Sequence, residues 1–171
     1  MNLIDALRSR RSIRRYQPRP IPKDLAASLI DAAQTAPSAG NLSARRYILV
    51  SNESMKRILA MAAYSQEHIE SAPLLIVICA DVAASSIRYG SRGSLYAIQD
   101  ADAAAMCLLL AAHDAGLGGC WNGAFDDDLV REALALEDGV LPVAILSLGW
   151  PAESPARPER PRRAGDVRWI D

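Results

Sequence analysis

Two long apolar segments in the middle of the chain constrain its fold more than any other feature. Residues 74–79 form a continuous apolar run of strand length, which predicts a central strand buried on both faces. Residues 96–115 are rich in Ala and Leu and end at Gly116, which predicts a helix buried on most of its surface. Such a helix needs other elements around it. The chain has 171 residues, half of them hydrophobic, so we expect one domain with a sizeable core.

Shorter patterns predict the remaining elements. Apolar residues at helical spacing predict helices near residues 3–7, 22–36, 55–62 and 129–136. Short apolar runs predict strands over residues 47–50 and 143–148. Turn-rich or polar stretches predict loops over residues 10–20, 37–41, 85–94 and 116–123.

Composition disfavours several classes of protein. Aromatic residues are scarce and the chain outside its arginine-rich ends is acidic, which argues against a nucleic-acid partner. We find no apolar run near the roughly 18 to 20 residues that cross a bilayer, and no secretory signal, so we expect a cytoplasmic protein with no membrane partner. Cys79, Cys107 and Cys120 form no CxxC pair, and with His68 and His113 they lack zinc-site spacing. We therefore expect reduced thiols and no metal site.

Basic residues are concentrated near the two chain ends although the net charge is only −1. Eleven of the nineteen basic residues are arginines within residues 8–19 and 157–168. Guanidinium groups bind phosphate through paired hydrogen bonds, so the two clusters indicate an anionic ligand; solvated basic stretches are the alternative. The tail, residues 151–171, is rich in Pro and cannot form its own core. We expect it to lie over another protomer.

Three segments are candidates for a binding site. The first holds Arg10, Arg11, Ser12 and Arg14 in a loop, where they could satisfy several oxygens of one phosphate. The second is the turn at residues 36–41, Ala-Pro-Ser-Ala-Gly-Asn, which could approach a flat heterocycle or serve as a plain connection. The third, residues 116–123, follows a predicted helix and does not match GxGxxG. A Rossmann site is therefore disfavoured, and the segment is either a glycine-rich helix cap or a source of backbone donors.

The order of these motifs resembles that of the nitroreductase (NADH-flavin oxidoreductase) family. The resemblance rests on RRSIR, APSAGN, AIQDADAAAMCLLLAAHDAGLGGCWNGAF, PVAILSLGWP and an Arg-Pro tail, and it covers nearly the whole chain. It implies an α+β fold with a mostly antiparallel central sheet flanked by helices. It also implies an intertwined homodimer with FMN at the interface and residues 151–171 extending onto the partner protomer.

The resemblance assigns roles residue by residue. The FMN phosphate would be held by Arg10, Arg11, Ser12 and Arg14, together with a tail arginine of the other protomer, Arg160 first and Arg162 second. The isoalloxazine edge would be lined by Pro37, Ser38, Ala39, Asn41 and Ser43, and its central ring by Trp121, Asn122 and Gly123. The sequence departs from the family at Ser43, where Gln is common, and at Met106-Cys107, where Gln-Asn is usual. We expect Cys107 to be a packed, inert thiol.

The chemistry implied by the resemblance belongs to the cofactor. NAD(P)H would deliver hydride to flavin N5, and a nitroaromatic, quinone or similar acceptor would then be reduced in a ping-pong cycle. No side chain is required as an acid or base. Three questions stay open: whether the fold instead supports reductive dehalogenation or oxygen-dependent flavin cleavage, whether the chain is a non-catalytic homologue, and whether NADH or NADPH is preferred.

Overall fold

The computed structural model describes residues 2–157 and 167–170. Its α-helices are α1 (Leu3–Ser9), α2 (Lys23–Gln34), α3 (Glu53–Ala62), α4 (Glu67–Glu70), α5 (Val82–Tyr89), α6 (Gly93–Asp114) and α7 (Asp127–Ala133). Two short 3-10 helices are η1 (Ala39–Asn41) and η2 (Gly90–Arg92). The strands are β1 (Arg45–Val50), β2 (Leu74–Asp81), β3 (Gly118–Asn122) and β4 (Val140–Gly149). Both strands expected from short apolar runs and the strand expected at 74–79 are confirmed.

The described strands form one antiparallel sheet in the order β1-β2-β4-β3. In β2, Ile76 pairs with Leu146 and Leu74 with Leu148, and the register shifts between Ile78 and Cys79. Pro142, which has no N–H to donate, lies opposite Cys79 at this irregularity, where a ladder tolerates proline. The expected antiparallel sheet flanked by helices is confirmed.

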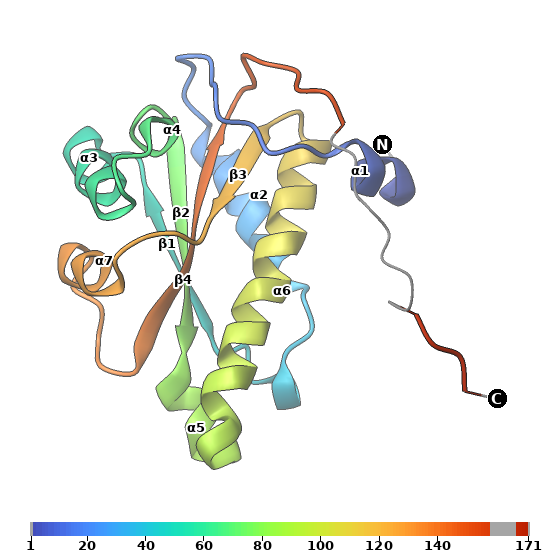
Figure 1. Ribbon diagram of the computed structural model, residues 1–171, viewed down its shortest axis with the longest axis vertical. Helices are drawn as coiled ribbons and strands as arrows, with labels where there is room; N and C mark the ends of the chain where they lie inside the picture. Colours follow the sequence, from blue (N-terminus) through green and yellow to red (C-terminus); the bar gives the residue numbers. More distant parts are fainter. Residues whose placement is uncertain (1, 158–166, 171) are drawn as a thin grey trace.

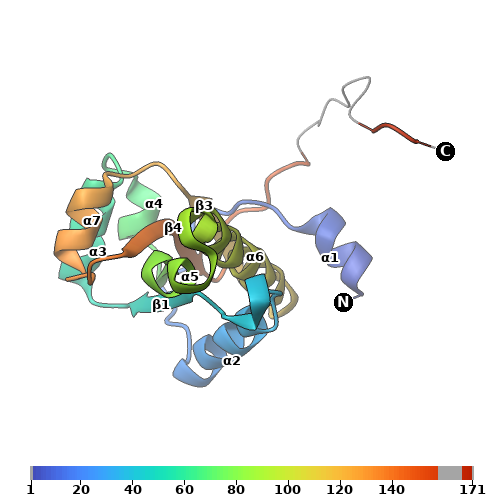
Figure 2. The same cartoon turned by 90° about the horizontal axis from the view of Figure 1, so that it is seen from below.

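Helices cover both faces of the sheet (Figure 2). Alternate residues of β2 point to opposite faces: Ile76 and Ile78 pack in a cluster with α2 and α6, whereas Leu75 and Val77 pack with α3 and α7. All four side chains are fully buried. This two-sided burial explains why β2 is a continuous apolar run rather than an alternating one.

Two segments expected to be loops are instead ordered elements. Most of residues 85–94 lies in α5 and η2, and α5 begins where the Asp81 side chain accepts a hydrogen bond from the Ala84 N–H. α6 accordingly begins at Gly93, earlier than expected. The glycine-rich segment contains strand β3, which pairs with β4 from Gly118 opposite Gly149 to Asn122 opposite Ile145. Pairing with an existing strand overrides the low strand propensity of glycine.

The stretch Val82–Asp114 is long and apolar enough to cross a membrane by length and composition, although polar residues interrupt it. Gly90 breaks it with a φ of 53°, a backbone conformation that favours glycine. Beyond that break, α6 buries Ala101, Ala104 and Leu108 in the cluster that covers one face of the sheet. This is the packing of a core helix.

Candidate functional site

The arginine-bearing segment, residues 10–17, is fastened to β3 and to the start of the tail. Ser12 bridges to Gly119, and Tyr16 bridges to Pro151. Backbone hydrogen bonds join Ile13 N to Gly119 O (3.0 Å), Gln17 N to Trp150 O (2.8 Å) and Ala152 N to Arg15 O (2.9 Å). The segment is therefore fixed by hydrogen bonds to β3 and to the start of the tail, although it contains no helix or extended strand.

A tail carboxylate also holds this segment. Glu153 Oε1 accepts hydrogen bonds from the backbone N–H groups of Arg14 (2.6 Å) and Arg15 (3.1 Å). Next to these contacts, the buried side chain of Ile13 lies against Gly118, where an added Cβ would lie 2.7 Å from it. The backbone on either side of Arg14 is thus fixed, while the Arg14 side chain is exposed to solvent.

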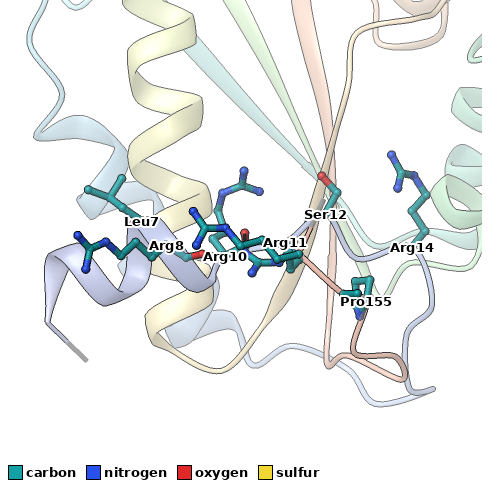
Figure 3. Close-up of a pocket in the computed structure, with 9 residues that line it drawn as sticks. Leu7, Arg8, Arg10, Arg11, Ser12, Arg14 and Pro155 are labelled. Carbon is teal, nitrogen blue, oxygen red and sulfur yellow. Dashed lines mark hydrogen bonds between the residues drawn. The ribbon is translucent and has the colours of Figure 1, made fainter. Parts of the chain in front are cut away.

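Arginine side chains from both chain ends surround a hollow of about 350 Å³. Its lining residues are Leu7, Arg8, Arg10, Arg11, Ser12, Arg14, Pro155, Ala156 and Arg157. Figure 3 shows Arg8 and Arg10 on one side of Ser12 and Arg14 on the other. Among the described residues that line this hollow, none is acidic. The hollow therefore presents several guanidinium groups that can bind an anion, and no lining carboxylate.

One of these arginines also has a structural task. Arg11 Nη1 donates to the carbonyl oxygens of Arg8 and Arg10, each at 2.8 Å, at the end of α1. These bonds satisfy carbonyl groups that a helix end leaves without partners. Arg11 thereby fixes the path of the backbone that carries Arg10 into the hollow.

The structure thus brings together the four residues expected to hold a phosphate, namely Arg10, Arg11, Ser12 and Arg14. It adds Arg8 and Arg157, which belong to the two arginine clusters but were not selected from the sequence. Arg160 and Arg162 lie outside the described residues. The contact between residues 8–14 and residues 155–157 occurs within one chain.

A second hollow, of about 590 Å³, lies beyond Arg14 and is lined by Arg14, Arg15, Tyr16, Glu67, His68, Ser71 and Ala152. The Tyr16 hydroxyl donates to one of its close oxygen neighbours, Ile13 O (2.6 Å) and Ser147 O (3.0 Å), and also contacts Ser147 Oγ (2.9 Å). Burial raises the pKa of Tyr16 well above its ordinary value, more than the Ser147 hydroxyl lowers it. Tyr16 therefore lines this hollow with an uncharged side chain.

The Asn122 side chain, expected near a ligand, is committed to the interior. Asn122 is 4% exposed and its Nδ2 donates to Ile145 O at 2.7 Å, so its Oδ1 faces His68 Nε2 at 2.6 Å. Because Oδ1 can only accept, His68 Nε2 must carry the proton. Neighbouring Trp121 is half-buried and Gly123 is exposed. The contact of His68 with Asn122 could not be predicted from the sequence, because the two residues are far apart in the chain and His68 belongs to no motif.

The loop expected to line the flavin edge has an unusual backbone. Gly40, Asn41 and Ser43 have φ values of 56°, 59° and 48°. Asn tolerates this region because its short side chain bonds locally, whereas Ser adopts it less readily. The Ser38 hydroxyl accepts a hydrogen bond from Ser43 N at 3.0 Å. Asn41 and Ser43 are exposed, while Pro37, Ser38 and Ala39 range from exposed to half-buried.

Two buried charged residues hold this loop, and neither was selected from the sequence. The Asp100 carboxylate accepts from Ala39 N (2.9 Å) and Ala44 N (3.3 Å). The guanidinium of Arg45 donates to the carbonyl oxygens of Gln34 (3.0 Å), Ala36 (3.0 Å), Pro37 (3.4 Å) and Asp100 (3.3 Å). Asp100 and Arg45 are 4% and 7% exposed. They act as internal braces that set the loop's shape.

Within one chain, this loop and the arginine hollow lie at opposite ends of α6. The loop is bonded to Asp100 near the start of the helix, whereas Ser9 of α1 contacts His113 Nε2 at 2.8 Å near its end. Thirteen residues of α-helix separate the two points by about 20 Å. Figure 1 shows α1 at one end of α6 and η1, the short blue-cyan helix after α2, toward the other end. The structure therefore does not bring the two predicted halves of the site together in one protomer.

Comparison with known proteins identifies the family. The family model described as "Nitroreductase family" matches residues 7–66 and 59–150. The chain belongs to the nitroreductase family. A Thermus thermophilus protein named NADH dehydrogenase is 35% identical over 174 residues, covering 84% of this chain and 84% of that protein. The Bacillus subtilis FMN reductase (NADPH) is 29% identical over 178 residues, covering 95% of this chain and 72% of the relative.

A solved structure of the NADPH:FMN oxidoreductase from Vibrio harveyi, complexed with NAD+, has the same fold as this nitroreductase-family chain. The two share 25% sequence identity and a TM-score of 0.86, over 98% of this chain and 79% of that one. The family resemblance found in the sequence and the α+β fold it implies are therefore both confirmed.

Proposed function

We propose that this member of the nitroreductase family is an FMN-dependent oxidoreductase that uses NAD(P)H to reduce a nitroaromatic, quinone or similar acceptor in the cytoplasm. The observation that carries this proposal is the arginine hollow formed by residues 8–14 and 155–157. Its described lining combines five guanidinium groups with the Ser12 hydroxyl and no acid, a donor set that fits a phosphate dianion. Membership of a family whose relatives include an FMN reductase supports FMN as the bearer of that phosphate.

The described residues divide the binding work. Arg10, Ser12 and Arg14 would hold the phosphate, and Arg11 would position them through its bonds at the end of α1. When bound, FMN supplies the redox chemistry by accepting a hydride from NAD(P)H at N5 and passing it to the acceptor. The chain's own task is to bind and orient.

Residues that line the second hollow, beyond Arg14, would hold the ring of the flavin. Trp121 and Asn122 are the last two residues of β3, and Gly123 comes directly after the strand. Asn122 is held close to this region by its bonds to His68 and Ile145. A backbone N–H from this segment would face N5. Because a fixed N–H needs no reorganisation during hydride transfer, it would stabilise the developing charge on the ring.

The site would be completed by a second copy of the chain. Residues Pro37, Ser38, Ala39, Asn41 and Ser43 lie too far along α6 to meet the same chain's arginine hollow, so the partner's loop would supply the isoalloxazine edge. The apolar face of α1 is free to pack on that copy, since Leu3, Ile4 and Leu7 are 66%, 52% and 49% exposed. Burying such a face stabilises association. The whole chain would then be one FMN-binding domain of a homodimer.

Purification and anaerobic reduction test the proposal. The purified protein should be yellow and release FMN on denaturation, and NADH or NADPH added without oxygen should bleach the oxidised flavin. A nitroaromatic or quinone added afterwards should restore the colour. Sedimentation should give twice the chain mass of 18.4 kDa. A protein that binds FMN but is bleached by neither nucleotide would overturn the proposed reaction.

A further inference from the structure

A cluster of two arginines and two tyrosines, which we call the Arg–Tyr patch, lies on α5, η2 and the start of α6. Its members are Arg88, Tyr89, Arg92 and Tyr96. The two rings meet edge to face with centroids 4.9 Å apart, and the guanidinium carbons of Arg88 and Arg92 lie 5.6 and 5.0 Å from the centroids of Tyr89 and Tyr96. Arg92 Nε also donates to the Tyr96 hydroxyl at 2.8 Å. The patch is thus a preorganised surface of cations and aromatic rings.

Within the part of the chain that the structure describes, the arginines of this patch have no acidic partner. Neither Arg88 nor Arg92 takes part in an ion pair there, unlike Arg46, Arg57 and Arg131. Both patch arginines are exposed. Each guanidinium has five N–H donors, and one donor from each is used in the bonds to Gly40 O and to the Tyr96 hydroxyl. Most of their hydrogen-bonding capacity therefore faces solvent and is available to an anion.

The patch is continuous with the loop proposed to line the flavin. Arg88 Nη1 donates to Gly40 O at 3.2 Å, next to Asn41. A Cβ added at Gly40 would collide with the Tyr89 hydroxyl and lie 2.8 Å from Arg88 Nη1, so loop and patch are in close contact. On the other side, a Cβ at Gly90 would meet no atom within 4 Å, which means that the surface there is open. A ligand that reaches the flavin past Asn41 would therefore pass over Arg88.

We propose that the Arg–Tyr patch binds the phosphate groups of the nicotinamide nucleotide. This inference rests on the proposed function, in which NAD(P)H delivers hydride to a flavin whose edge is lined by residues 37–43. NADH and NADPH both carry a pyrophosphate, and NADPH adds a 2′-phosphate; guanidinium groups recognise either through charge-assisted hydrogen bonds. The patch would then anchor the part of the nucleotide that does not react, which lowers KM without changing the hydride step.

Kinetics with phosphate-bearing and phosphate-free hydride donors test this assignment. Arg88→Gln and Arg92→Gln would be compared with wild type for NADH, NADPH and dihydronicotinamide riboside, which has no phosphate. We expect each variant to raise KM for the phosphate-bearing donor about tenfold, the effect of losing one charge-assisted bond at an exposed site. For Arg92→Gln, which has no bond to the flavin loop, the riboside reaction and the bound FMN should be unchanged. Arg92→Lys should recover part of the loss, because it keeps the charge but not the planar donor set.

Arg57→Gln is the matched control, since Arg57 is an exposed arginine on α3, which packs on the other face of the sheet. Its kinetics should equal those of wild type. A rise in KM for NADH and NADPH alike assigns the pyrophosphate to the patch, and a rise for NADPH alone assigns the 2′-phosphate. Unchanged KM for both nucleotides, or an equal loss with the riboside, would overturn the assignment while leaving FMN reduction intact. Wild-type protein that no donor reduces would instead overturn the proposed function itself.

Discussion

Replacing Gly118 with alanine would push directly on the backbone that carries the arginines. The new Cβ would lie 2.7 Å from both Cβ and Cγ1 of Ile13 and 2.8 Å from its Cγ2. Ile13 is buried and branched at Cβ, so no rotamer change removes all three contacts. The segment that contains Ser12 and Arg14 must therefore move away from β3.

The expected cost follows from these contacts. Overpacking a buried site costs about 1–3 kcal/mol, and weakening the hydrogen bond from Ile13 N to Gly119 O adds about 1 kcal/mol. For a chain of this size, the melting temperature of the FMN-free protein should fall by roughly 5–15 °C. FMN affinity, measured by fluorescence titration at a temperature where the variant is folded, should fall about tenfold or more because Ser12 and Arg14 are displaced together.

A double variant separates overpacking from other causes. Adding Ile13→Ala to Gly118→Ala removes Cγ1 and Cγ2, two of the three crowded atoms. The double variant should then lose less stability than the sum of the two single variants, an interaction that a double-mutant cycle measures directly. Strictly additive losses, or a Gly118→Ala protein with wild-type melting temperature and FMN affinity, would refute this account of how the segment is held.

Two further predictions concern groups that brace the site. Asp100→Ala should destabilise the chain by about 2 kcal/mol in urea unfolding and speed amide exchange in residues 39–44, because two backbone N–H groups lose their acceptor; Asp100→Asn, which keeps one acceptor oxygen, should lose less. Unchanged exchange in the alanine variant would contradict this. Burial and the charges of Arg10 and Arg11 lower the pKa of His113, so the unfolded chain binds a proton more readily. The unfolding free energy of the FMN-free protein should therefore fall as pH drops below about 6.5, and less steeply in His113→Gln; equal slopes would argue against this effect.

The core elements were predictable because short stretches of sequence determine them. The apolar run of β2 and the Ala-Leu segment of α6 are each too apolar to remain at a surface, so burial and element type follow from the pattern alone. The antiparallel arrangement of the sheet came from the family resemblance. No pattern in these strands distinguishes it from a parallel sheet.

Strand β3 could not be predicted because its pairing depends on distant residues. Gly118 and Gly119 lack side chains where Ile13, Leu109 and Leu148 occupy the space. Read locally, two glycines after a helix predict a cap or a loop. Only the packed structure shows that small residues are required there for close approach of the arginine segment and α6.

The candidate site likewise contains some residues that the sequence predicts and others that it does not. The arginines near the N-terminus were recognisable because several side chains of types that can bind phosphate stand within five residues. Asp100 and Arg45, by contrast, lie within a helix and a strand, and nothing near them in sequence indicates that each hydrogen-bonds to the connecting loop. Asn122 stands in a recognisable motif, yet its amide serves the interior, which only its partners His68 and Ile145 reveal.

The most direct test of the arginine hollow is a comparison of FMN with riboflavin, which has the same ring system without the phosphate. Isothermal titration of both ligands would be done with wild type and with Arg10→Ala, whose side chain lines the hollow but not the region beyond Arg14. The account predicts that wild type prefers FMN and that the variant loses about 1.5–3 kcal/mol of FMN binding while its riboflavin affinity stays the same. Equal losses for both ligands, or a wild-type protein that binds them equally, would contradict a phosphate site at this end of the chain.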